Sequence, residues 1–230
     1  MNSQWHKRVS AKIESVLVLI AFCCQSSLAI AGPFEDQCAE IAPRQSNVVN
    51  VSMAELTIDE SRSTTEDLAI IAGTYNGMDR QIGGVASAEP LIEHKIEANL
   101  ALLPDAKGVC ARPAIQLTIG YASMSVFMDR EIPRNSCIYN AIFAHEMHHI
   151  AIYKDYISRN VDQIRQRVEE KFNGKVYFFE SIFAAKQYVE ILGQVFVRHV
   201  SDKFLGDIYA EQRALDTQSE YARMQNECFH

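Results

Sequence analysis

The sequence has 230 residues, with 22 Lys and Arg against 29 Asp and Glu, a net charge of −7 and 48% hydrophobic residues. This length suits one domain, or two small ones, and the composition argues against disorder, collagen and a protein with several membrane spans. Because the balance is acidic and no block of Lys and Arg occurs, nucleic acid and an anionic membrane are excluded as expected partners.

Residues 1–31 have the pattern of a secretory signal peptide. A basic start is followed by a nine-residue apolar run at 16–24 and by a small-x-small cleavage pattern at 29–31. Nine apolar residues are too few for a membrane span, which needs about 20. We therefore expect an exported protein, periplasmic or extracellular, without a membrane span after cleavage, whose residues 32–230 form a single domain. The basic residues of this segment are Lys7, Arg8 and Lys12.

Residues 32–230 differ from the whole chain in charge and in cysteine content. The first 31 residues hold three cations and one anion, so the remainder carries a net charge of −9. An even number of cysteines in an exported chain predicts two disulfides. We expect Cys110 to pair with Cys137, which closes a local loop, and Cys38 to pair with Cys228, which ties the termini. No pair of cysteines has the close spacing of a structural zinc site.

The first half of the remaining chain predicts strands. Residues 47–56 suggest one strand, and 60–90 are rich enough in Gly, Ser and Thr to form a connection with loops or short helices. Apolar and polar residues alternate over 92–102, and a second β-like run covers 115–128, so the two predict an antiparallel pair. An edge strand within 115–128 is expected to pair with an extended peptide substrate.

The second half predicts helices. Asn135 or Ser136 can cap a helix that continues to about Phe172, and amphipathic patterns follow over 177–205 and 207–226. Strands followed by helices indicate an α+β fold.

One motif in the first of these helices carries chemistry. His145, Glu146 and His149 form the pattern HExxH, in which positions i and i+4 share a helix face and can hold one Zn²⁺. Glu146 lies beside that face, where it can accept a proton from a zinc-activated water. The two histidines also lie in an otherwise apolar, inward-facing stripe, and burying them without partners would cost free energy. The stripe consists of Ile138, Ile142, His145, His149, Ile152 and Tyr156.

A catalytic zinc normally has three protein ligands, so a third must come from elsewhere. Asp155 stands at the position that a metzincin-like turn would use, but the helical pattern continues through it. Glu211 and Asp216 lie on the last predicted helix, five residues and about 140° apart, so only one of them can face the metal. His199 and Tyr221 are candidates for stabilising the oxyanion of the reaction.

The chain resembles the zincin-type metallopeptidases, and in particular a group of secreted bacterial zinc-dependent peptidases described mainly as a domain of unknown function. The shared features are the strands, HExxH at the start of a long helix, and a late Gln-x-x-aromatic-Asp-x-x-Thr-x-His pattern. Here Leu215 stands at the aromatic position, Ser219 at the Thr and Tyr221 at the His. The resemblance implies a zincin-like α+β domain, with antiparallel strands first, then the HExxH helix and further helices.

These observations predict an exported zinc peptidase. His145 and His149 hold the metal with Glu211 or Asp216, Glu146 is the general base, and the partner is a peptide or protein substrate. Two alternatives stay open: a periplasmic binding or assembly factor with a structural or lost zinc, and a zinc-dependent amidase. A fourth protein ligand such as His148 or His199 would favour the structural role. The sequence does not indicate an oligomeric state.

Overall fold

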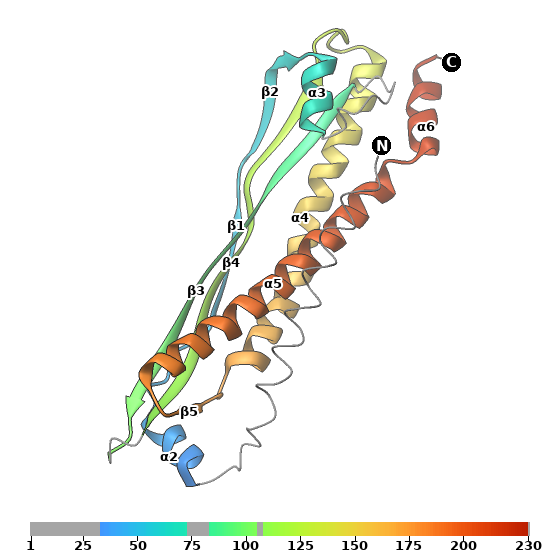
Figure 1. Cartoon of the computed structure of the whole chain (residues 1–230). Coiled ribbons are helices and arrows are strands. Elements are labelled where there is room, and N and C mark those ends of the chain that lie inside the picture. Colours follow the sequence, from blue (N-terminus) through green and yellow to red (C-terminus); the bar gives the residue numbers. More distant parts are fainter. Residues whose placement is uncertain (1–32, 73–82, 105–107, 230) are drawn as a thin grey trace, which may run out of the picture. The chain divides into compact units, whose positions relative to one another are not determined.

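The computed structural model describes residues 33–72, 83–104 and 108–229. The chain divides into two compact units, residues 1–37 and 38–230. Of the first unit, only the start of helix α2 (Pro33–Ile41) lies in the described ranges, and the predicted signal peptide lies outside them. The remaining described elements belong to the second unit (Figure 1).

The second unit contains one five-stranded sheet built around the long strand β4 (Val109–Asp129). Strand β3 (Gly84–Leu102) pairs with β4 in the antiparallel direction along its whole length. The opposite side of β4 is occupied by β1 (Val48–Met53) and β2 (Leu56–Ser63), both parallel to it, and by the short antiparallel strand β5 (Tyr177–Phe179). β4 is therefore the central strand of the sheet.

This topology corrects two predictions. The fold is mixed α/β, and the zincin-like α+β class with antiparallel strands first is wrong, because β1 and β2 join the sheet in parallel with β4. The runs expected to form a hairpin do pair antiparallel, as β3 and β4. The edge strand expected within 115–128 is also wrong, since β4 pairs with β3 on one side and with β1 and β2 on the other and is therefore not an edge. Alternation shows which face of a strand is buried, and it carries no information about direction or partners.

The core lies between one face of the sheet and two long helices, α4 (Cys137–Phe172) and α5 (Ile182–Leu215). Alternate residues of β4 face these helices and are almost fully buried. The alternation changes phase at Ala122, which has no partner because Glu89 pairs with Ser123 and Pro90 with Tyr121. The buried residues of β4 in this core are Ile115, Leu117, Ile119, Tyr121, Met124, Val126 and Met128.

The helix predicted from 136 to 172 is confirmed as α4. Its N-cap is Ser136, whose hydroxyl accepts a hydrogen bond from the backbone N–H of Tyr139 at 3.2 Å. The chain leaves the helix at Asn173, and Gly174 follows in the left-handed region with φ +69°.

The two later helices have different bounds from those predicted. Residues 177–179 form β5, α5 then continues without a break to Leu215, and α6 spans Gln218–Phe229. Gly206 does not end α5, although glycine costs about 1 kcal/mol in a helix. The neighbouring buried side chains Phe204 and Ile208 pack into the core on either side of it and outweigh that cost. A short helix, α3 (Thr65–Ile71), lies in the expected connection.

The described residues contain two disulfides, as predicted, but their pairing differs from the prediction. Cys38 is bonded to Cys110, and Cys137 is bonded to Cys228. Cys110 lies at the start of β4, and Cys137 follows its end, so roughly 60 Å of strand at about 3.3 Å per residue separates them. Cys110 and Cys137 are therefore close in sequence but too far apart in space to form the predicted bond.

Candidate metal site

The HExxH residues lie on the inward face of α4. His145 and His149 are 3% and 7% exposed, and their Nε2 atoms lie 3.1 Å apart. The two rings are one helical turn apart on the stripe that faces the core, so both imidazoles point to the same place. The prediction that the imidazoles of His145 and His149 point to one place is confirmed.

Asp216 supplies the third atom of the group. It is the C-cap of α5, and its Oδ1 lies 3.1 Å from His145 Nε2 and 3.0 Å from His149 Nε2. Three ligand atoms thus form a nearly equilateral triangle. A tetrahedral zinc with bonds of about 2.0 Å separates its ligand atoms by roughly 3.3 Å, close to these distances. His145, His149 and Asp216 can therefore hold a metal ion.

The other candidates for the third ligand lie elsewhere. Glu211 is turned away from the histidines and pairs with Arg159, whose Nη2 is 2.6 Å from Glu211 Oε2. Asp155 is exposed on the outer side of α4. The choice depends on where each carboxylate meets α4: Glu211 contacts Arg159, ten residues after His149, whereas Asp216 contacts the two histidines.

Two predicted or possible histidine contributors are also absent from the group. His199 is exposed and lies 17 residues before Asp216, roughly 25 Å along the helix at about 1.5 Å per residue. His148 is exposed on the outer face of α4. Within the ranges that the structure describes, no fourth His, Cys, Asp or Glu joins the three ligands.

Each ligand histidine has a second partner at its other ring nitrogen. His149 Nδ1 donates to Gln212 Oε1, and Gln212 Nε2 donates to the carbonyl oxygen of His149 at 3.1 Å. His145 Nδ1 lies 3.6 Å from Glu220 Oε1, just beyond hydrogen-bonding distance. Sequence reasoning did not assign Gln212 and Glu220 to the site. The available signal for Gln212 was its spacing of four residues before Asp216, one helical turn away. Glu220 lies on the separate helix α6, so no spacing along one helix indicated it.

Glu146 is held between α4 and β3. It is 7% exposed, and one of its carboxylate oxygens accepts a hydrogen bond from the backbone N–H of Ala86 at 2.7 Å. The close approach of the helix depends on Gly84, where a Cβ would lie 2.8 Å from Ile142 Cγ2 and 3.0 Å from Glu146 Cγ. Burial raises the pKa of Glu146, and the two neighbouring histidines and the Ala86 N–H partly offset that rise.

The charges of the triangle stabilise one another. Burial disfavours the ionised form of Asp216, but hydrogen bonds from both histidines outweigh it and hold its pKa well below the usual range. Burial likewise opposes a charge on His149, yet its hydrogen bonds to Asp216 and Gln212 raise its pKa. The site therefore presents an ionised carboxylate beside two imidazoles.

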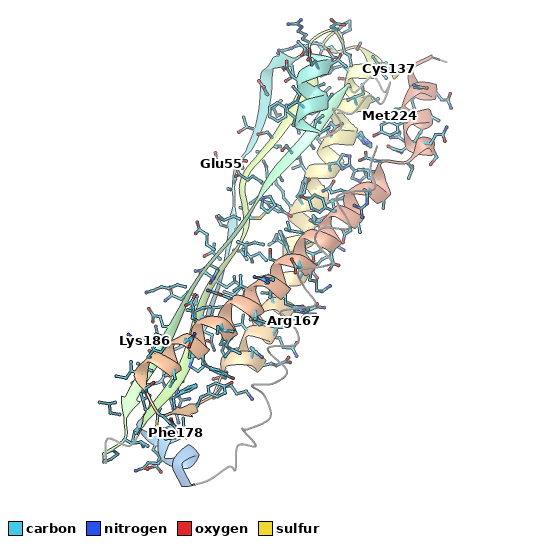
Figure 2. The ribbon with its side chains drawn as sticks, viewed as in Figure 1. Glu55, Cys137, Arg167, Phe178, Lys186 and Met224 are labelled. Atoms are coloured by element: carbon cyan, nitrogen blue, oxygen red, sulfur yellow. A yellow bond between two sulfur atoms is a disulfide. The ribbon has the colours of Figure 1, made fainter. Side chains whose placement is uncertain are left out.

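Helix α6 completes the site. Tyr221 donates its hydroxyl hydrogen to Asp216 Oδ1 at 3.1 Å, and its ring centroid lies 5.7 Å from that of His145. Hydrogen bonds from Arg223 lower the pKa of Glu220 to about 2, so this carboxylate is charged. The Cys137–Cys228 disulfide ties α6 to the start of α4. Figure 2 shows Cys137, at the start of α4, near Met224 of α6. Tyr221, a sequence candidate for stabilising the oxyanion, thus contacts Asp216 and His145.

No protein-family model, curated protein or solved structure gives a significant match to this chain. The described residues contain no helix with the length and apolar character that crossing a membrane requires.

Proposed function

We propose that this chain is an exported zinc-dependent peptidase. The observation that carries the proposal is the triangle of His145 Nε2, His149 Nε2 and Asp216 Oδ1, with edges of 3.0–3.1 Å, beside the buried Glu146. Two imidazoles and one carboxylate form a ligand set that suits zinc and is common in hydrolytic zinc sites. The donor types and their separations fit a tetrahedral ion.

The number of ligands favours catalysis over a structural role. A structural zinc is enclosed by four protein ligands, whereas a catalytic zinc keeps one position for water or substrate. The described residues supply three ligands. The histidines are buried, but 41% of the Asp216 side chain is exposed, so the group is accessible from the side of Asp216.

The reaction follows from the residues around this position. When bound, zinc supplies a Lewis acid that polarises a carbonyl oxygen and makes a nearby water easier to deprotonate. Glu146 accepts a proton from the attacking water as the water oxygen bonds to the carbonyl carbon. Glu146 then delivers that proton to the amide nitrogen as the C–N bond breaks, giving a carboxylic acid and an amine. The Tyr221 hydroxyl, next to Asp216, can donate to the oxyanion.

Burial prepares Glu146 for both halves of this proton transfer. A carboxyl group with a raised pKa binds the proton of water more readily than an ordinary carboxylate does. The backbone N–H of Ala86 holds the Glu146 carboxylate against β3, so the donor that fixes the carboxylate is part of the main chain. Export is supported by the two disulfides, which persist in oxidising compartments.

The substitution Glu146→Gln tests the proposal. Gln keeps the volume and cannot accept a proton from water, so cleavage of an unfolded protein substrate should fall by about 10²–10⁴-fold while bound zinc stays at one ion per chain. The matched control is Glu211→Gln, a carboxylate on α5 that pairs with Arg159 and should retain both zinc and activity. A Glu146→Gln protein with the wild-type rate of cleavage would refute the mechanism.

A further inference from the structure

We propose that the Cys137–Cys228 disulfide makes the metal site sensitive to thiol reductants. Cleavage of this bond releases α6 and weakens metal binding, whereas the Cys38–Cys110 disulfide resists the same reductant. The inference rests on the metal site of the proposed function, and it concerns the regulation of that site. It does not depend on which bond the site hydrolyses.

The two disulfides differ in their access to solvent. Cys38 and Cys110 are 1% and 0% exposed and lie in a small apolar cluster. Cys137 is exposed at the first residue of α4, and Cys228 is partly exposed near the end of α6. Thiol–disulfide exchange requires the attacking thiolate to reach a sulfur atom. A reductant can therefore attack the Cys137–Cys228 bond in the folded protein, whereas burial protects the other bond.

Reduction of the exposed bond proceeds in two exchange steps. One thiolate of a dithiol attacks a sulfur of the Cys137–Cys228 bond, so a mixed disulfide forms and the other cysteine leaves as a thiolate. The second thiol of the reagent then attacks the mixed disulfide and releases the remaining cysteine. Two electrons and two protons pass from the dithiol to the protein, and the reagent becomes a cyclic disulfide.

Helix α6 has few other contacts that hold it in place. Of residues 218–228, Met224 alone is buried, with 4% of its surface exposed. An isolated helix of 12 residues is marginally stable in water. Loss of the disulfide therefore frees the far end of α6, and the helix can move about residues 216–217, which join it to α5.

The joint between α5 and α6 contains a metal ligand. Asp216 directly follows α5, and its Oδ1 lies 3.1 Å from His145 Nε2 and accepts a hydrogen bond from the Tyr221 hydroxyl at 3.1 Å. Glu220, also on α6, has a carboxylate oxygen 3.6 Å from His145 Nδ1. Movement of α6 therefore changes the surroundings of two ligands, Asp216 and His145. Because such neighbours orient the ligands, the metal should bind more weakly.

The test uses the full chain in its metal-free, oxidised form, treated with increasing dithiothreitol, alkylated with iodoacetamide and then freed of both reagents. Mass spectrometry of the peptides identifies the alkylated cysteines. Cys137 and Cys228 should be alkylated at dithiothreitol concentrations that leave Cys38 and Cys110 bonded. Residues 218–228 should then exchange their amide hydrogens faster. Zinc affinity, measured by competition with a chelator, should fall by about tenfold.

Two double variants are the controls. In Cys137→Ser with Cys228→Ser, zinc affinity should equal that of the reduced wild type and should not respond to dithiothreitol. Cys38→Ser with Cys110→Ser should keep the wild-type response.

Two results would overturn the inference. The first is that both disulfides open at the same dithiothreitol concentration. The second is that zinc affinity stays within about twofold of the oxidised protein after the Cys137–Cys228 bond alone is cleaved. Both measurements are made on the wild-type chain, so neither needs a variant to fold. No step uses a substrate, so failure of peptide cleavage with intact zinc binding counts only against the proposed function.

Discussion

Removal of the Cys137–Cys228 disulfide tests whether α6 is part of the metal site. This bond joins the first residue of α4 to the end of α6, and α6 carries Tyr221 and Glu220 to Asp216 and His145. Replacing both cysteines with Ser should loosen α6. The metal should then bind more weakly, because the ligands lose neighbours that orient them.

The structure supplies a matched control in the second disulfide, Cys38–Cys110. The two bonds close loops of 91 and 72 residues. In the chain-entropy treatment these loops correspond to about 4.6 and about 4.4 kcal/mol of stability at 25 °C, so the two double variants should be destabilised by nearly equal amounts. Cys110 pairs with Phe178 across the sheet, and Figure 2 shows Phe178 at the end of the second unit away from Cys137.

The two variants should differ in metal affinity. We expect zinc affinity to fall about tenfold, or about 1.4 kcal/mol, when Cys137 and Cys228 are replaced, and to stay within about twofold of wild type when Cys38 and Cys110 are replaced. Urea unfolding gives the stability of each variant, and chelator competition on the folded protein gives the affinity. Equal affinities in the two variants would refute a role for α6. Glu220→Gln, which leaves both disulfides intact, should weaken zinc binding in the same direction.

Three further predictions concern the ligands and the packing behind them. Asp216→Ala should abolish stoichiometric zinc binding in elemental analysis, whereas Glu211→Ala should leave one zinc per chain; the reverse outcome would make Glu211 the ligand. Gly84→Ala should destabilise the protein by about 1–3 kcal/mol in urea unfolding because a Cβ there meets the HExxH helix, while Gly206→Ala, with nothing within 4 Å, should gain up to about 1 kcal/mol. Because the pKa of His149 is raised in the metal-free protein, protons compete for its Nε2 more strongly than they would for an ordinary imidazole. Zinc affinity should therefore fall as pH is lowered through that pKa and level off above it; chelator competition at several pH values checks this, and an affinity independent of pH would contradict it.

The parts of the fold that the sequence predicted are local. The 3.6-residue stripe of α4 and its cap at Ser136 were visible, and they turn His145 and His149 inward in the structure. The antiparallel pairing of β3 with β4 was predicted from two consecutive β-like runs, 92–102 and 115–128, although β3 begins eight residues earlier, at Gly84. These features depend on residues within a few turns of one another, so short windows of sequence contain the information.

Other parts of the candidate site depended on the relative placement of elements. Glu211 and Asp216 were nearly equal candidates, and the structure separates them because Arg159 on α4 pairs with Glu211. His199 was expected to help stabilise the oxyanion, but the unbroken length of α5 carries it roughly 25 Å from the ligand group at about 1.5 Å per residue. The sequence showed Gln212 only as the first residue of the late Gln-x-x-aromatic-Asp pattern, because its contact is with the backbone carbonyl of His149 on another helix.

The sequence by itself therefore determined the HExxH helix, its inward face and the existence of two disulfides, because periodicity, capping and composition are properties of the chain. The tertiary structure alone decided that β1 and β2 run parallel to β4, that Cys38 pairs with Cys110 and Cys137 with Cys228, and that Asp216 joins the histidines. Each of these depends on which surfaces meet when elements distant in sequence pack together. Hydrophobic burial drives that packing but does not specify strand direction, cysteine partner or third ligand, so these are decided only in the completed fold.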